Sequence, residues 1–245
     1  MNKTIMKKVI LVIIGIIVIA ATGFVVWGST PQGPMKEVEP YLLSSDSITV
    51  TKKPWLAFTP NNGTAKTGFI FYPGGHVNYK SYAPGAYQLA EKGILVVIVP
   101  MPLSLAVMDP GAARSVIVAH PEIKRWVVGG HSLGGVMAAN YAYNHLEDVS
   151  GLVLWAAYPA DNNVLSSSNL PVISIYGSQD GMVTELEASR RSLPAKTEFI
   201  VIKGGNHAQM GWYGDQAGDN VATISREEQQ SILINSTWDF IKGLE

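Results

Sequence analysis

A serine flanked by glycines, set between an apolar run and an alanine-rich run, constrains the fold of this chain more than any other feature. Residues 130–134 read Gly-His-Ser-Leu-Gly and fit the pattern Gly-x-Ser-x-Gly. Residues 125–128 before the pattern predict a strand, and residues 136–143 after it predict a helix. So sharp a turn leaves no room for a Cβ beside the serine, lifts the Ser132 hydroxyl above a sheet, and aims the Leu133 N–H at a developing oxyanion. The alternative is a glycine-rich turn with an incidental serine.

A serine hydroxyl needs a neighbouring base before it can act as a nucleophile at neutral pH. The chain has five histidines. His207 is the candidate base, because it stands in GGNHAQMG directly after the predicted strand 198–202. His131 is expected to point away from the Ser132 hydroxyl and to pack behind it, and His76 either lines the site or is an ordinary loop residue. The two others, His120 and His145, are expected at the surface.

The base needs an acid that holds its ring in one orientation. Asp180 lies in YGSQDG at the carboxyl end of the predicted strand 172–176, where site residues of parallel sheets collect. Asp161, after the preceding strand, is the rival. Asp180 is favoured because its loop is expected to face the loop of His207, although an aspartate before a glycine also suits a plain turn.

The rest of the chain alternates short apolar runs with helical segments, which predicts an α/β fold with a mostly parallel sheet covered by helices on both faces. Strands are predicted at residues 47–51, 55–58, 67–72, 94–99, 125–128, 152–156, 172–176 and 198–202. Helices are predicted at residues 82–91, 111–119, 136–145, 185–193 and 225–241, the last with a capping box from Ser225 to Glu228. The chain therefore divides into residues 1–28, a linker at 29–46 that is rich in Pro and Gly in its first half, and one domain at 47–245.

The order Ser132, Asp180, His207 and the blocks around them resemble the α/β-hydrolase superfamily. More narrowly, YPGGHV, GGHSLGGVMAANYA and GGNHAQMG resemble the small bacterial α/β-hydrolase fold-5 group. The resemblance implies a serine hydrolase that forms an acyl-enzyme on Ser132. It also implies a second oxyanion donor in the loop after the third strand, for which Gly75 N–H is our choice and His76 N–H the alternative.

Only about fifteen residues separate the predicted strands that end at residue 156 and begin at residue 172, too few for a helical cap domain. The site should therefore be open, and the expected substrate is a small-molecule carboxylic ester. A thioesterase, a lactonase or a peptidase could use the same residues, and a non-catalytic membrane-tethered binding module is the rival from another class. An apolar pocket is predicted from residues near the carboxyl ends of the strands: His76, Met101, Leu103, Trp155, Tyr158, Met210, Trp212 and Tyr213.

Residues 9–27 carry no charge, and Lys3, Lys7 and Lys8 precede them. As a helix they would be about 28 Å long, close to the hydrocarbon thickness of a bilayer. We expect an N-terminal transmembrane anchor with its N-terminus in the cytoplasm and the domain outside. A cleaved signal peptide, which would leave a secreted protein, and a buried core helix are the alternatives.

The composition narrows the chemistry further. The formal net charge is −1 and there is no cysteine, which argues against a nucleic-acid partner and excludes disulfides, thiolate metal sites and a cysteine nucleophile. We find no metal-ligand cluster and no phosphate-binding loop, and so expect no cofactor. The oligomeric state has no indicator in the sequence.

Overall fold

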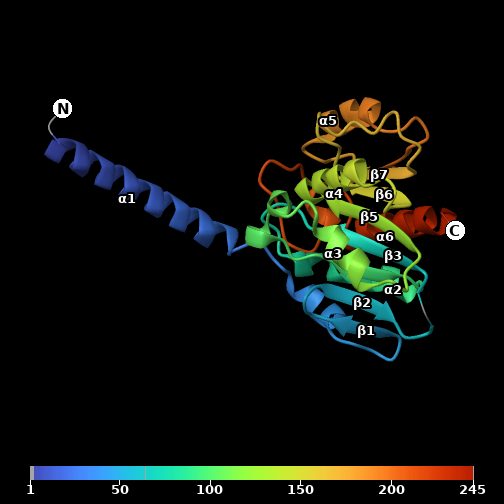
Figure 1. The fold of residues 1–245 in the computed structure, drawn as a ribbon. Helices are drawn as coiled ribbons and strands as arrows, with labels where there is room; N and C mark the ends of the chain where they lie inside the picture. The colour runs from blue at the N-terminus through green and yellow to red at the C-terminus, as the bar shows by residue number, and fades with distance from the viewer. Residues whose placement is uncertain (1–2, 64, 245) are drawn as a thin grey trace.

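The computed structural model describes residues 3–63 and 65–244, which form a sheet with helices on both faces and a long helix that projects from the body (Figure 1). The eight-stranded sheet has the order β1-β2-β4-β3-β5-β6-β7-β8. β1 and β2 form an antiparallel hairpin at one edge, and the strands from β4 onward pair in parallel. The strands are β1 (Ile48–Thr51), β2 (Leu56–Pro60), β3 (Thr67–Tyr72), β4 (Leu95–Ile98), β5 (Arg125–His131), β6 (Gly151–Trp155), β7 (Val172–Gly177) and β8 (Glu198–Ile202).

Alternating side chains of the strands fill two cores, one on each face of the sheet. Phe69 and Phe71 of β3 pack with α2 (Ala83–Glu91) and α6 (Arg226–Gly243) on one face. Ile70 and Tyr72 of the same strand pack with α3 (Ala112–Ala119) and α4 (Leu133–Asn144) on the other. A strand buried on both faces is apolar throughout, as predicted for a parallel sheet under helices. The predicted fold class is therefore confirmed.

The predicted elements differ from the observed ones mainly at their ends. β5 continues through the two glycines to His131, three residues beyond the predicted strand. The helix expected at residues 185–193 is divided into α5 (Val183–Ala188) and the 3-10 helix η5 (Ser189–Ser192). At the start of α6 the Ser225 hydroxyl accepts the Glu228 N–H at 3.1 Å, which is the cap that the sequence predicts.

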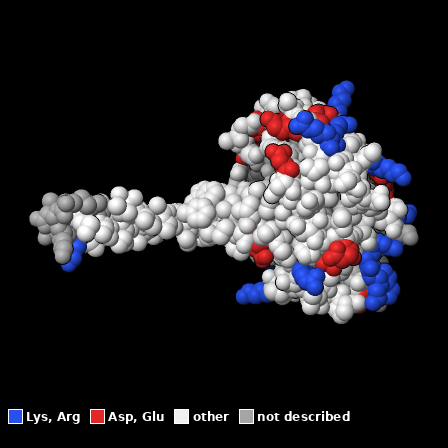
Figure 2. All heavy atoms as spheres, turned by 45° about the horizontal axis from the view of Figure 1, so that its top comes forward, with Lys and Arg blue, Asp and Glu red and all other residues white. Residues whose placement is uncertain are grey.

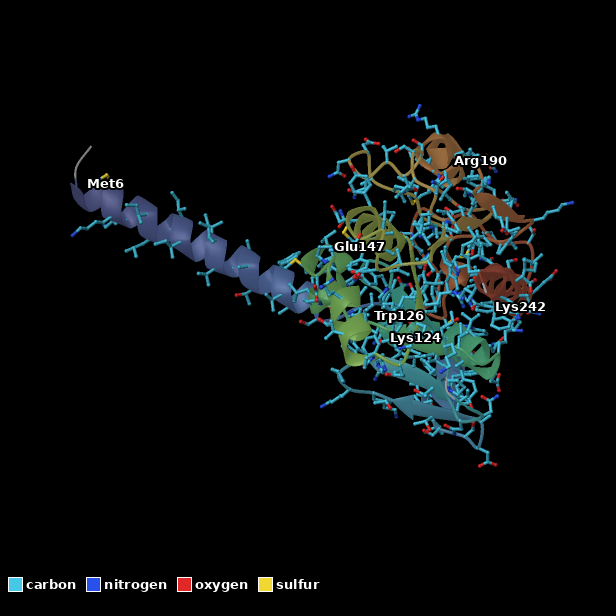
Figure 3. The ribbon with its side chains drawn as sticks, turned by 45° about the vertical axis from the view of Figure 1, so that its right-hand side comes forward. Met6, Lys124, Trp126, Glu147, Arg190 and Lys242 are labelled. Atoms are coloured by element: carbon cyan, nitrogen blue, oxygen red, sulfur yellow. The ribbon has the colours of Figure 1, made fainter. Side chains whose placement is uncertain are left out.

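The N-terminal helix α1 (Lys3–Gly28) extends away from the body and packs on it only at its end (Figures 1 and 3). Its segment Met6–Gly28 is long and apolar enough to cross a membrane, with a mean hydropathy of 3.2. The large apolar side chains described along it are exposed, from Met6 at 42% to Ile19 at 74%. A buried core helix is therefore excluded.

Residues 29–46, which we predicted to be a tether, lie against the body. They contain the 3-10 helix η1 (Lys36–Leu42), whose Val38 is fully buried in the core. The Met35 N–H also donates to the Trp212 carbonyl at 2.8 Å. The proline and glycine content of this segment therefore shapes a packed connection rather than a free linker.

Candidate active site

Ser132 lies on the turn between β5 and α4, and its backbone has a conformation that residues other than glycine rarely adopt. Its φ is 51° and its ψ is −127°. The Ser132 N–H donates to the Trp155 carbonyl at 3.0 Å, and the Ser132 carbonyl accepts the Val136 N–H at 3.1 Å. These bonds to a neighbouring strand and to the new helix hold the strained turn, while the Ser132 side chain stays partly exposed.

The glycines beside Ser132 are required by space. A Cβ on Gly130 would lie 2.6 Å from the Tyr72 carbonyl oxygen. A Cβ on Gly134 would lie 2.1 Å from the same oxygen and 2.3 Å from the Pro73 carbonyl oxygen. Both clashes are with backbone, which cannot move aside. The steric reason that the sequence suggested for the two glycines therefore holds in the structure.

Strained backbone gathers at this edge of the sheet. The non-glycine residues with positive φ among those described all lie in connections after the carboxyl ends of β3, β4, β5 and β6: His76, Leu103, Ser104, Ser132 and Ala156. Each such residue costs on the order of 1–3 kcal/mol, and such residues cluster where a site is held in shape. The strain therefore points to this edge independently of the serine.

His207 and Asp180 form a buried pair at the ends of β8 and β7. The His207 Nδ1 and the Asp180 Oδ2 lie 2.9 Å apart, and both side chains are almost completely buried. The second oxygen of Asp180 accepts the Met182 N–H at 2.8 Å. On the other side of the ring, His207 Nε2 has no hydrogen-bond partner among the described residues. The ring is thus fixed through one nitrogen and has the other free.

His131, next to Ser132, connects the serine turn to His207. The centres of the two imidazole rings are 4.6 Å apart. His131 Nδ1 is hydrogen-bonded to the Tyr82 hydroxyl at 2.8 Å, and this hydroxyl accepts the Gly74 N–H at 3.0 Å. Burial, and after it the nearby His207, hold the pKa of His131 well below its ordinary value. His131 is therefore a neutral packing partner, as predicted, and it presents no positive charge to His207.

Asp219 is a site residue that the sequence analysis missed. Its Oδ1 accepts the Gly181 N–H at 3.1 Å and the His207 N–H at 3.2 Å, and its Oδ2 accepts the Ala208 N–H at 2.7 Å. One carboxylate thus ties the loop of Asp180 to the loop of His207. Asp219 belongs to a polar loop with no fixed spacing from either partner, so no pattern in the sequence marks it.

The two expected oxyanion donors lie against each other. A Cβ on Gly75 would be 3.0 Å from Leu133 Cδ2, so the loop after β3 touches the start of α4. Leu133 is the first residue of that helix and its N–H has no acceptor within the helix. The Gly75 N–H likewise has no acceptor among the described residues. The His76 N–H donates to the Ser104 carbonyl at 2.8 Å, which removes it as the alternative donor.

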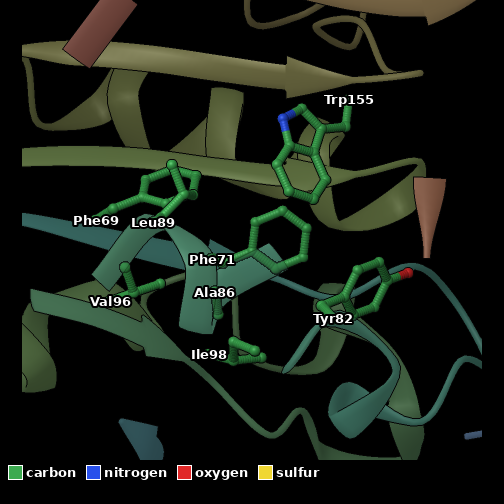
Figure 4. Close-up of a pocket in the computed structure, with 8 residues that line it drawn as sticks. All are labelled: Phe69, Phe71, Tyr82, Ala86, Leu89, Val96, Ile98 and Trp155. Carbon is green, nitrogen blue, oxygen red and sulfur yellow. The ribbon is translucent and has the colours of Figure 1, made fainter. Parts of the chain in front are cut away.

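The predicted apolar pocket is wrong for several of its members. Trp155 is 2% exposed, and its ring packs 4.7 Å from Phe71 in the core between the sheet and α2 (Figure 4). Its Nε1 donates to Thr237 Oγ1 at 3.0 Å. The reason is the alternation of strand β6, which turns this side chain to the α6 face. Three other predicted pocket residues are also buried in the core: Met101, Met210 and Tyr213. The remaining four are partly exposed: His76, Leu103, Tyr158 and Trp212.

The connection between β6 and β7 places no helix over the turn of Ser132. Residues 156–171 contain no helix. The absence of a cap domain, which we inferred from the length of this segment, is therefore confirmed.

A possible group of metal ligands lies elsewhere. Donor atoms of His145, Glu147 and Asp148 are within 4.8 Å of one another after the end of α4. The Asp148 carboxylate already accepts hydrogen bonds from Arg114 and from the Tyr141 hydroxyl, both at 3.1 Å. Because α4 has twelve residues, this group is about 18 Å from Ser132. The arrangement at Ser132 does not involve it.

The sequence was compared with models of known protein families. The alpha/beta hydrolase family pattern matches residues 68–231, more than half of the chain and all of the site. The chain belongs to the alpha/beta hydrolase family. Hydrolase is thus the activity class that the family and its fold support.

Solved structures agree with this family and show the fold. Dienelactone hydrolase from Anabaena variabilis is 16% identical with a TM-score of 0.58, over 82% of this chain and 96% of that one. Est1E from Butyrivibrio proteoclasticus, with ferulic acid bound, is 12% identical with a TM-score of 0.55, over 82% and 98%. TT1662 from Thermus thermophilus is 15% identical with a TM-score of 0.53, over 80% and 98%. No curated protein sequence matches the chain.

Proposed function

We propose that this member of the alpha/beta hydrolase family is a serine hydrolase that cleaves carboxylic esters. Ser132 is the nucleophile, His207 the general base and Asp180 the acid that orients it. The observation that carries the proposal is the buried His207–Asp180 pair, in which His207 Nε2 has no partner among the described residues and the His207 ring lies 4.6 Å from that of His131, the residue before Ser132.

The proposed reaction has two steps, with Asp180 holding the proton on His207 Nδ1. His207 Nε2 takes the proton of Ser132 as its oxygen attacks the ester carbonyl, and the N–H groups of Gly75 and Leu133 bind the oxyanion. The ester C–O bond breaks, and the leaving alcohol takes the proton from Nε2. Water then attacks the acyl-enzyme as His207 Nε2 takes its proton, the bond to Ser132 breaks, Ser132 takes that proton back, and the acid leaves.

Ester is favoured over the other acyl bonds on two grounds. The connection between β6 and β7 forms no helix over the turn of Ser132, and an alcohol leaves more readily than an amine when one protonated histidine supplies the proton. Two proteins with the same fold carry names, Est1E and dienelactone hydrolase, that fit ester and lactone substrates. A panel of esters, thioesters, lactones and peptides at equal concentration orders these activities by kcat/KM.

We further propose that α1 spans the cell membrane, with the N-terminus in the cytoplasm and the body outside. Lys7 and Lys8 lie at the start of the apolar segment, and the next lysine is Lys36. Positive residues stay on the cytoplasmic side of a membrane helix. Externally added protease should therefore digest the body in intact spheroplasts. Protection of the body, or its release into the medium, would contradict the proposal.

Replacement of the nucleophile tests the activity. Ser132→Ala should lose hydrolysis of short p-nitrophenyl esters by at least about a thousandfold, because no second nucleophile is placed at the turn. Ser166→Ala is the matched control, since Ser166 is an exposed serine in the β6–β7 connection, and it should keep the wild-type rate. Full hydrolysis by a folded Ser132→Ala protein would exclude the proposed mechanism.

A further inference from the structure

The last turn of α1 is fastened to the loop that carries Gly75. The rings of Trp27 and His76 stack with their centres 4.2 Å apart and their planes at 8°. The His76 Nε2 donates to the Trp27 carbonyl at 2.7 Å. The same carbonyl also accepts the Thr30 N–H at 3.1 Å and the Thr30 hydroxyl at 3.0 Å, so the His76 bond adds a contact from the body to this helix end. The membrane helix is therefore joined to the proposed oxyanion loop by both ring contact and hydrogen bond.

Further hydrogen bonds make the joint rigid. The Ser104 hydroxyl donates to the Gly28 carbonyl at 3.1 Å, and the Ser104 carbonyl accepts the His76 N–H at 2.8 Å. The Gln32 N–H donates to the His76 carbonyl at 2.9 Å, and the Asn78 N–H donates to the Gln32 carbonyl at 2.9 Å. The chain leaving α1 thus pairs with the loop after β3. The end of α1 is therefore attached to the loops after β3 and β4.

The joint sets the position of Ser132 relative to the bilayer. The 23 residues of Met6–Gly28 make about 35 Å of helix, slightly more than the roughly 30 Å of hydrocarbon. Trp27, at the end of this length, falls at the interface, where tryptophan is enriched in membrane proteins. His76 stacks on Trp27, and its neighbour Gly75 lies against Leu133. The site is thus only a few residue contacts from the edge of the hydrocarbon.

The surface beside the joint is apolar. Residues 93–108 contain no charged residue. Within them, the 3-10 helix η3 (Pro102–Ser104) contacts α1, and the next one, η4 (Ala106–Met108), exposes Val107 at 47% and Met108 at 53%. On the face that Figure 2 shows, the atoms where α1 meets the body come from uncharged residues. The apolar surface ends at Met108, because the next residue, Asp109, is charged and exposed.

We propose that the joint holds the turn of Ser132 close to the membrane surface and that the substrates are carboxylic esters with long hydrocarbon chains dissolved in the bilayer. The proposal rests on the proposed function, because it needs hydrolysis at Ser132 and a membrane-spanning α1. The lack of a helical cap fits it. A site whose substrate arrives from the bilayer is covered by the membrane itself.

The absence of cysteine makes the placement measurable. Val107→Cys and Val118→Cys each provide one thiol for an environment-sensitive fluorophore in the full-length protein, reconstituted in phosphatidylcholine vesicles. Val118 is a matched control, because it is 70% exposed at the far end of α3, which leads to the opposite edge of the sheet. Lipids with a spin label near the headgroup should quench the probe at 107 at least twofold more than the probe at 118. Equal quenching at the two positions would overturn the placement.

Activity in the same vesicles tests the substrate class. Val107→Asp/Met108→Asp puts charge on the apolar surface and should lower hydrolysis of a long-chain ester in the bilayer at least fivefold. Hydrolysis of a short water-soluble ester should stay within twofold, and Val118→Asp should leave both rates unchanged. Equal long-chain rates in all three proteins would refute the inference. If the wild-type protein did not hydrolyse the short ester, the proposed function itself would be refuted, whatever the quenching shows.

Discussion

Asp180→Asn is the change that most sharply probes the geometry of the proposed triad. The carboxylate of Asp180 accepts one N–H from Met182 at 2.8 Å and faces His207 Nδ1 at 2.9 Å. An amide has only one oxygen and cannot do both. If that oxygen keeps the Met182 N–H, the amide NH₂ faces Nδ1 and forces the ring proton onto Nε2, where a base must be unprotonated.

The size of the effect follows from these two orientations. The reversed amide restores the proton on Nδ1 but sets an NH₂ against the partly buried Met182 N–H, at a cost of about 1–3 kcal/mol. It also lacks the negative charge that stabilises the imidazolium in the transition state. Together these losses predict a fall in kcat of about 10³–10⁴, which corresponds to about 4–5.5 kcal/mol.

The assay is kcat for a short p-nitrophenyl ester, with circular dichroism and thermal melting to show that the variant is folded. Asp161→Asn is the matched control, because Asp161 is exposed in the connection after β6, and its kcat should stay within twofold of wild type. A folded Asp180→Asn protein that kept a tenth of the wild-type kcat would refute the role given to Asp180.

Three further changes test other parts of the account. Gly134→Ala places a Cβ 2.1 Å from a backbone oxygen of β3 and should lower the free energy of unfolding by about 3 kcal/mol in urea, whereas Gly111→Ala, with open space around it, should have almost no effect. Asp219→Asn should lower kcat about 10–100-fold and leave KM nearly unchanged, because it loosens the link between two loops without touching substrate. The lowered pKa of His131 means that only the unfolded chain takes up this proton as the pH falls below about 6.5. The unfolding free energy should therefore decrease there by at most about 1.4 kcal/mol per pH unit from this group, and urea titrations of His131→Gln should lack that part of the slope.

The turn around Ser132 can be predicted from sequence because its requirements are local. Two glycines, an apolar run before them and a helical run after them are all adjacent in the chain, and the clashes at Gly130 and Gly134 follow from that arrangement. The pairing of Asp180 with His207 is less local. It was predictable because both residues follow strands of one parallel sheet, whose carboxyl ends meet at one edge.

The residues that were missed or misplaced depend on packing between distant segments. Whether Trp155 faces the site or the core is decided by the alternation of β6, which the sequence pattern leaves open in a strand that is apolar at every position. The contact of Trp27 with His76 joins segments 49 residues apart, and the intervening Pro and Gly suggested a mobile tether. Asp219 acts through backbone N–H groups, which leave no trace in side-chain composition.

Covalent labelling identifies directly whether Ser132 is the nucleophile of a hydrolase. The full-length protein is treated with a fluorophosphonate and the modified residue is located by mass spectrometry of its peptides. The account predicts one adduct per chain, on Ser132, formed slowly or not at all in Asp180→Asn and absent in Ser132→Ala. An adduct on another residue, or undiminished labelling of Ser132→Ala, would contradict it.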